Sequence, residues 1–145
     1  MQEDALRMLR YCRFSIEYSD GNHDREAIDA LTLFAVLSER LSGERVRQEL
    51  QKILSHERCA STIDLLNKTG LDKTSLGCDL VVGSVPSSPQ DLRLVIAGSG
   101  WLVLLVAIIP QRDVSMVLER LRLSRADQKF CEQLAQSNPA QIFAQ

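Results

Sequence analysis

The chain has 145 residues, 45% of them hydrophobic and 25% charged, which is typical of a folded globular protein and argues against disorder. A chain of this length can bury a core without help from disulfides or a structural metal. The net charge of −2 argues against a globally basic nucleic-acid-binding protein but leaves room for a local basic face.

The first half of the sequence has helical periodicity, with four helices expected at residues 3–18, 24–37, 43–54 and 59–68. Ser42 is a suitable N-cap for the third helix, and Gly70 is a suitable end for the fourth. Residues 72–88 are rich in Gly, Pro and Ser, so we expect a loop there. This loop divides the chain into two predicted domains, residues 1–71 and 72–145.

The second half is also predicted to be helical. Pro89 can begin a helix after Ser88, and further helices are expected at residues 101–109, 112–121 and 124–137. The run at 101–109 is apolar but about half as long as a membrane-spanning helix, so it is predicted to be a buried helix, and no membrane partner is expected. The fold class predicted for the whole chain is all-α.

The four cysteines form no Cys-x-x-Cys pair, and the N-terminus is acidic, unlike a secretory signal peptide. We therefore expect reduced thiols and a cytoplasmic protein. His56 and Cys59 have the spacing of metal ligands, but a structural zinc site needs four ligands. The cysteines are instead predicted to be buried or half-buried, and no metal site is expected.

The helix at residues 3–18 has two chemically different faces. At 100° per residue, one face gathers apolar side chains and Arg13 (Ala5, Leu6, Leu9, Cys12 and Ile16 are the apolar ones). The other face gathers two carboxylates, two guanidiniums and two aromatic rings (Glu3, Asp4, Arg7, Arg10, Tyr11 and Phe14). The first face is predicted to be core, and the second is a candidate binding surface.

Asp4 and Arg7 are three residues apart and therefore neighbours on this helix. The carboxylate accepts hydrogen bonds and the guanidinium donates them. Side by side, they match the amino donor and ring-nitrogen acceptor on the pairing edge of cytosine or adenine, and they mismatch guanine and uracil. A bidentate contact of this kind is worth about 1–3 kcal/mol of discrimination. From spacing alone, an ordinary surface ion pair is the alternative.

Two motifs carry a family resemblance. Residues 3–14 resemble the neck-helix signature Glu-Asp-x-x-Arg-x-x-Arg-x-x-Arg-Phe of class II (bacterial-type) CCA-adding tRNA nucleotidyltransferases and poly(A) polymerases. Residues 42–50 are similar to the family's Ser-x-Glu-Arg-Ile-x-x-Glu-Leu helix. With weaker matches at 65–71 and 120–124, the resemblance spans residues 3 to about 125.

The resemblance implies the neck and body of such an enzyme, with tRNA as partner and ATP and CTP as substrates. Asp4 and Arg7 match the pair that selects the base. Glu3 and Arg10 would lie near the nucleotide or the RNA end. The remaining matched residues would support the template helix: Arg13, Glu44, Arg45 and Glu49.

The sequence departs from the family because it lacks the features of the catalytic head domain. It has no Asp-x-Asp pair and no phosphate-binding glycine loop. We therefore expect this chain to bind and select but not to catalyse alone, with Mg²⁺ held by a head domain. A separate polypeptide that carries this domain is a candidate partner. No catalytic residue is assigned and no DNA partner is expected. A poly(A) polymerase fragment and a stand-alone RNA- or protein-binding module stay open as alternatives.

Overall fold

The computed structural model describes residues 2–19, 24–56, 58–81 and 100–136, and every regular element in these ranges is helical. The all-α prediction is therefore confirmed. The first part contains α1 (Gln2–Ser19), α2 (Arg25–Phe34), η1 (Ala35–Arg40), α3 (Gly43–Leu54), α4 (Cys59–Thr69) and α5 (Leu71–Leu76). The second part contains α7 (Gly100–Ile108), η3 (Gln111–Asp113), α8 (Val114–Arg120) and α9 (Arg125–Gln136).

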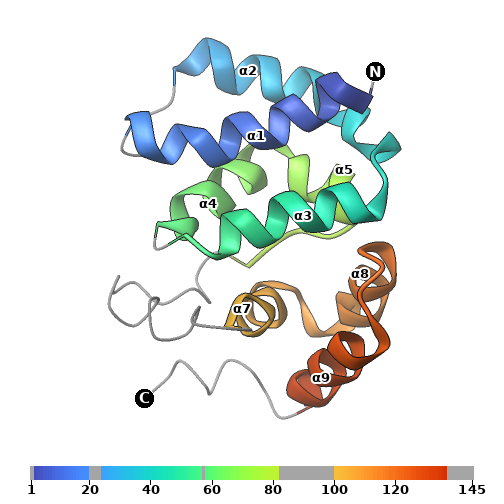
Figure 1. The fold of residues 1–145 in the computed structure, drawn as a ribbon. Coiled ribbons are helices and arrows are strands. Elements are labelled where there is room, and N and C mark those ends of the chain that lie inside the picture. The colour runs from blue at the N-terminus through green and yellow to red at the C-terminus, as the bar shows by residue number, and fades with distance from the viewer. Residues whose placement is uncertain (1, 20–23, 57, 82–99, 137–145) are drawn as a thin grey trace.

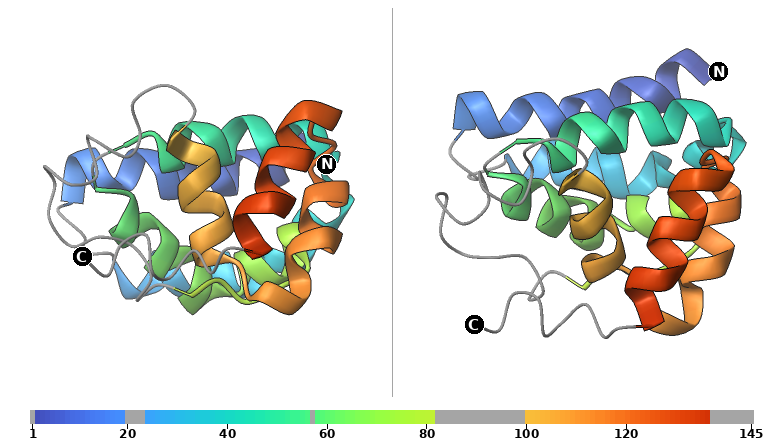
Figure 2. Two further views of the ribbon diagram at one scale, coloured as in Figure 1. Left: turned by 90° about the horizontal axis from the view of Figure 1, so that it is seen from below. Right: turned by 60° about the horizontal axis from the view of Figure 1, so that its bottom comes forward.

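The helices form three groups (Figure 1). α1 and α2 lie along one side of the molecule, α3, α4 and α5 lie in the middle, and α7, α8 and α9 lie on the opposite side. α1 packs against η1, α4 and α3, and α3 in turn contacts α7. The side-by-side packing of α8 and α9 is visible in both views of Figure 2.

Most predicted helix ends agree with the structure. α3 has the predicted bounds because the Ser42 side chain accepts a hydrogen bond from the Arg45 backbone N–H at 3.3 Å. α4 ends at Gly70, whose φ of +80° favours a residue without a Cβ. The predicted helix at 24–37 is shorter than expected, because a 3₁₀ helix begins at Ala35.

The prediction of a loop over residues 72–88 is wrong at its start, where α5 continues to Leu76. Buried Asp72 organises this region. Its carboxylate accepts hydrogen bonds from the Asn67 side-chain amide at 3.0 Å, the Lys73 N–H at 2.7 Å and the Leu80 N–H at 2.9 Å. The helix predicted to begin at Pro89 lies outside the described residues.

α7 is buried along nearly its whole length, from Trp101 at 7% exposure to Ile108 at 0%, as predicted for a core helix. Within the described ranges, no single helix has the length and apolar composition to cross a bilayer. One broken pair, Gly100–Ile108 with Gln111–Arg120, passes that test only when taken together, and its two parts are bent by 112°.

Backbone contacts join the end of α8 to the middle group of helices. The Arg120 guanidinium donates to the carbonyl of Leu41 at 2.7 Å and to that of Ser75 at 3.2 Å. Arg47 donates to the carbonyl of Arg122 at 2.9 Å. The backbone of Gly43 also lies directly against that of Arg120, since a Cβ at position 43 would be 1.7 Å from the Arg120 carbonyl oxygen. Arg120, one of four arginines in the stretch 112–125, therefore has a structural role.

Gly43→Ala should destabilise the protein by about 1–3 kcal/mol, because the backbones of α3 at Gly43 and of α8 at Arg120 must move apart to admit a methyl group. Chemical denaturation would measure the loss. Gln48→Ala, at an exposed position of the same helix, should stay within about 0.5 kcal/mol of the parent. Equal stability of Gly43→Ala and the parent would contradict this close approach.

All four cysteines are buried as free thiols, as predicted. Burial raises the pKa of Cys12 to about 12 and that of Cys59 to about 11, from an ordinary value of 9.0. Burial, followed by nearby carboxylates, raises the pKa of Cys78 to about 12 and that of Cys131 to about 11. The thiols therefore stay protonated at neutral pH, which makes them poor nucleophiles and poor metal ligands.

The folded state keeps these four protons above pH 9, where unfolded thiols lose them. The thiol contribution to stability should therefore be complete below pH 9 and fall as pH rises through about 11–12. Denaturation between pH 7 and 11 would measure this, with a variant carrying Ser at all four positions as the reference. A parent that loses no more stability than the reference would contradict the assignment.

Candidate nucleotide and RNA site

The two faces of α1 are divided as the sequence predicts. Its buried face packs into the core through Ala5, Leu6, Leu9 and Cys12, each at most 6% exposed. Its outer face exposes Asp4, Arg7, Arg10, Tyr11 and Phe14. Glu3 and Ile16 lie within the helix, but their side chains are outside the described part of the structure.

Asp4 and Arg7 form a loose pair near the N-terminal end of α1. Nη1 of Arg7 lies 3.8 Å from Oδ1 of Asp4, which is longer than a hydrogen bond. The two side chains are 68% and 75% exposed, so water competes with their attraction. Both groups are therefore available to a ligand that offers better hydrogen-bonding geometry.

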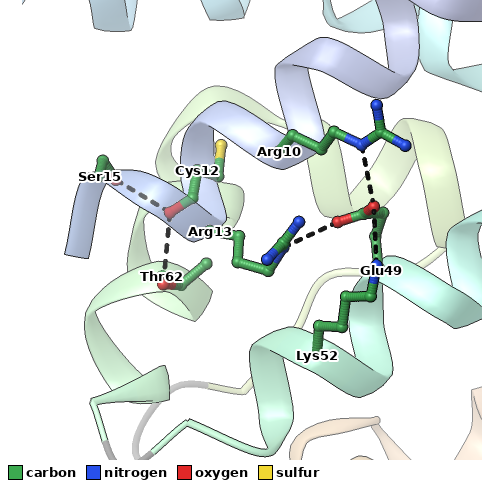
Figure 3. A network of polar contacts seen from close by, with 7 residues as sticks. All are labelled: Arg10, Cys12, Arg13, Ser15, Glu49, Lys52 and Thr62. Carbon is green, nitrogen blue, oxygen red and sulfur yellow. Dashed lines mark hydrogen bonds and ion pairs between the residues drawn. The ribbon is translucent and has the colours of Figure 1, made fainter. Parts of the chain in front are cut away.

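A buried carboxylate on α3 engages two arginines of α1. The Glu49 side chain is 4% exposed and accepts hydrogen bonds from Nε of Arg10 at 3.2 Å and Nε of Arg13 at 2.9 Å. Figure 3 shows both guanidiniums pointing from α1 toward this carboxylate. Because both carboxylate oxygens are paired with cations, the buried charge is compensated and α1 is fixed against α3.

The same cluster carries more positive than negative charge. Lys52 also approaches Glu49, with Nζ 4.0 Å from Oε1, so three cations surround one carboxylate. The side chains of Arg10 and Lys52 are 45% and 56% exposed, so their charge faces solvent. The seam between α1 and α3 is consequently a local basic surface on a chain with a negative net charge.

A second set of contacts joins α1 to α4. The carbonyl of Cys12 accepts hydrogen bonds from the Ser15 hydroxyl at 2.9 Å and from the Thr62 hydroxyl at 3.5 Å (Figure 3). Arg13 also stacks on Phe14, with its guanidinium carbon 4.3 Å from the ring centroid. α1 is therefore positioned from two neighbouring helices rather than by the Glu49 cluster alone.

Glu44 and Arg45 are placed differently from Glu49. Both side chains are exposed, and no hydrogen bond or ion pair joins either side chain to another described residue. Of these three residues of α3, Glu49 is the one whose side chain contacts α1 among the described residues. The sequence holds a signal for this difference, because Glu49 follows Val46 by three residues on the buried face of α3, whereas Glu44 does not share that face.

A groove of about 450 Å³, which the sequence pattern does not predict, lies beside the Asp4–Arg7 pair. Its walls come from α1, α2 and η1, and Asp4 is the one charged residue among the described side chains that line it. The other lining residues are apolar or aromatic: Met8, Tyr11, Ala27, Ala30, Leu31, Phe34 and Leu37. Its walls combine residues that are far apart in the sequence, so no local pattern predicts it.

The region around His56 does not resemble a metal site. Nδ1 of His56 accepts a hydrogen bond from the Arg58 backbone N–H at 3.0 Å, and Cys59 is fully buried. Among the described residues, no group of three or more potential metal ligands is close enough to hold an ion.

Comparison with known proteins relates this chain to a family. A family model described as "Probable RNA and SrmB-binding site of polymerase A" matches residues 24–75. The mitochondrial CCA tRNA nucleotidyltransferase 1 of Danio rerio is 31% identical over 134 residues, which are 90% of this chain and 31% of that protein. The chain belongs to the CCA-adding tRNA nucleotidyltransferase and poly(A) polymerase family.

Two mammalian relatives in this family match shorter regions. The mouse (Mus musculus) enzyme of the same name is 40% identical over 73 residues, covering 49% of this chain and 17% of the enzyme. The human (Homo sapiens) enzyme is 46% identical over 56 residues, covering 37% of this chain and 13% of the enzyme. This chain therefore spans less than a third of the relatives it matches.

The part matched by the family model begins at α2 and ends within α5, so it includes Phe34 and Glu49. Asp4 and Arg7 lie outside that match. The comparisons thus support RNA binding and tRNA processing for the family region, and the base-selecting role of α1 has to be argued from its own chemistry.

Glu49→Ala should lower the free energy of unfolding by about 1–3 kcal/mol, because Arg13 loses its buried partner and α1 loses its fixed position. Glu44→Ala, on the exposed face of the same family helix, should change it by less than about 0.5 kcal/mol. Thermal and chemical denaturation of the two variants would measure the difference. Equal stability of the two variants would show that the Glu49 cluster does not fix α1.

Proposed function

We propose that this chain is the nucleotide-selecting and tRNA-binding part of an enzyme that adds CCA to tRNA 3′ ends. The observation that carries the proposal is the Asp4–Arg7 pair, which is exposed and loosely joined on a helix fixed by Glu49. A fixed helix presents the two groups in a constant geometry, and their weak mutual contact leaves both free to bind a base.

The hydrogen-bonding pattern of the pair supports selection of C and A. Asp4 accepts from the exocyclic amino group of cytosine or adenine, and Arg7 donates to the adjacent ring nitrogen. Uracil and guanine offer a carbonyl where an amino group is needed and a ring N–H where an acceptor is needed. The carboxylate would then face an oxygen, and a mismatch of this kind costs about 1–3 kcal/mol.

The basic seam between α1 and α3 supports binding of the RNA backbone. Arg10 and Lys52 place exposed positive charge on and beside the helix that carries Asp4. Phosphate contacts of this kind position a nucleic acid without reading its sequence. We also assign Glu3 a place near the nucleotide, because it precedes Asp4 in the neck-helix motif.

We assign the transfer step itself to a head domain of the family's type. That domain would hold Mg²⁺ and act on ATP and CTP, while the residues of this chain bind and select. A cytoplasmic location is also proposed, although the three relatives carry mitochondrial names.

Asp4→Ala or Arg7→Ala should reduce the preference for CTP over UTP by about 5- to 150-fold, the equivalent of about 1–3 kcal/mol. Incorporation into tRNA lacking CCA would be measured with the head domain of a family member supplied in trans or fused. Arg112→Ala, at an 87% exposed site in the second part of the chain, is the matched surface control. Unchanged selectivity in both template variants would contradict the proposal.

The product distinguishes the proposal from its two alternatives. Addition of three nucleotides followed by termination supports CCA addition, whereas continued addition of A supports a poly(A) polymerase. Salt-dependent RNA binding without incorporation in any head–neck combination supports a stand-alone binding module.

A further inference from the structure

We infer that the groove between α1 and α2 is a stacking pocket for a nucleobase whose pairing edge is read at Asp4. The inference deepens the proposed function and rests on it, since it supplies the apolar part of a site whose polar part is the Asp4–Arg7 pair. Asp4 connects the two parts of this site, because it pairs with Arg7 and also lines the groove.

The groove has the composition that a flat heteroaromatic ring requires. Its floor is apolar, with buried Leu31 and half-buried Met8. Two aromatic rings stand at its rim, Tyr11 from α1 and Phe34 from α2, and they are 41% and 51% exposed. Aromatic side chains left open on a concave surface are the usual stacking partners of unpaired bases.

The polar end of the groove determines which ligand fits. Among the described lining residues, Asp4 is the one that carries a charge, and its carboxylate accepts hydrogen bonds without donating any. A purely aliphatic ligand would offer that carboxylate no hydrogen-bond donor. A nucleobase with an exocyclic amino group satisfies the carboxylate and fills the apolar part with its ring.

Helix geometry places these parts at compatible positions. Asp4, Met8 and Tyr11 follow one another at spacings of four and three residues, so they form one row along α1. At 1.5 Å per residue, Met8 lies about 6 Å and Tyr11 about 10 Å from Asp4 along the helix axis. A ring bound by its edge at Asp4 would lie over Met8 and reach toward Tyr11.

A free nucleotide and the 3′-terminal base of an RNA strand offer the same chemistry, so both are tested. The full chain, labelled at methionine methyl and aromatic ring positions, would be titrated by NMR to millimolar ATP, CTP, UTP and GTP, and separately with a short RNA ending in CC. We expect the signals of Met8 and Tyr11 to shift with ATP and CTP but not with UTP or GTP if free nucleotide is the ligand. If the RNA end is the ligand, only the oligonucleotide should shift them.

Two substitutions with matched controls test the stacking. Tyr11→Ala and Phe34→Ala should each weaken binding by roughly tenfold, a typical loss for one base–aromatic stack. Phe130→Ala on α9 and Leu33→Ala on α2 remove exposed apolar side chains that do not line the groove, 43% and 72% exposed, and should change affinity by less than twofold. Circular dichroism of all four variants would verify that they are folded.

The outcomes separate this inference from the proposed function. Binding weakened by Asp4→Ala but not by Tyr11→Ala or Phe34→Ala would overturn the stacking pocket and leave base selection intact. Binding indifferent to Asp4→Ala would overturn both. No shift at Met8 or Tyr11 with any nucleotide or RNA would overturn the inference, as would shifts that depend only on protein concentration, which would show that a second copy occupies the groove.

Discussion

The orientation of the outer face of α1 relative to α3 depends on one buried carboxylate. Glu49 reaches from α3 and engages two arginines of α1, so the outer face of that helix has a fixed orientation relative to the rest of the molecule. An unpaired carboxylate at this depth would be strongly destabilising. The packing of α1 on α3 therefore has to keep Arg10 and Arg13 opposite Glu49. This makes the contact a determinant of geometry more than a source of net stability.

The candidate site follows from that constraint. With Arg10 and Arg13 engaged by Glu49, Arg7 is the arginine of the neck-helix motif that stays beside Asp4 and remains mostly exposed. Lys52 and the outer part of Arg10 give the seam its positive charge. On the other side of α1, the groove that Asp4 shares lies between α1, α2 and η1. One helix thus contributes a base-reading pair between a cationic surface and an apolar one.

Local sequence signals were enough to predict much of the fold. The bounds of α3 follow from the Ser42 cap and from apolar residues at helical spacing, and the buried face of α1 follows from Ala5, Leu6, Leu9 and Cys12. α5 was missed because it is short and depends on Asp72, whose partners include the N–H of Leu80, eight residues further along. Long-range contacts of this kind leave no periodic signal.

The same limit applies to the site. The motif indicated which residues of α1 face outward, and the structure has Asp4 and Arg7 there. It did not separate Glu49 from Glu44 and Arg45, because the motif does not record which side of α3 meets α1. The groove required residues from α1 and α2 together, so it emerged only when the two helices were placed side by side (Figure 1).

The central claim, that Glu49 serves nucleotide selection by fixing the helix that carries Asp4, is tested most directly by a double-mutant cycle. The ratio of CTP to UTP incorporation would be measured in the reconstituted enzyme for the parent, Glu49→Gln, Asp4→Ala and the double variant. If Glu49 acts through α1, Glu49→Gln lowers the ratio in the parent and has no further effect once Asp4 is removed. Equal losses in both backgrounds would show that Glu49 acts independently of Asp4 and would contradict the claim.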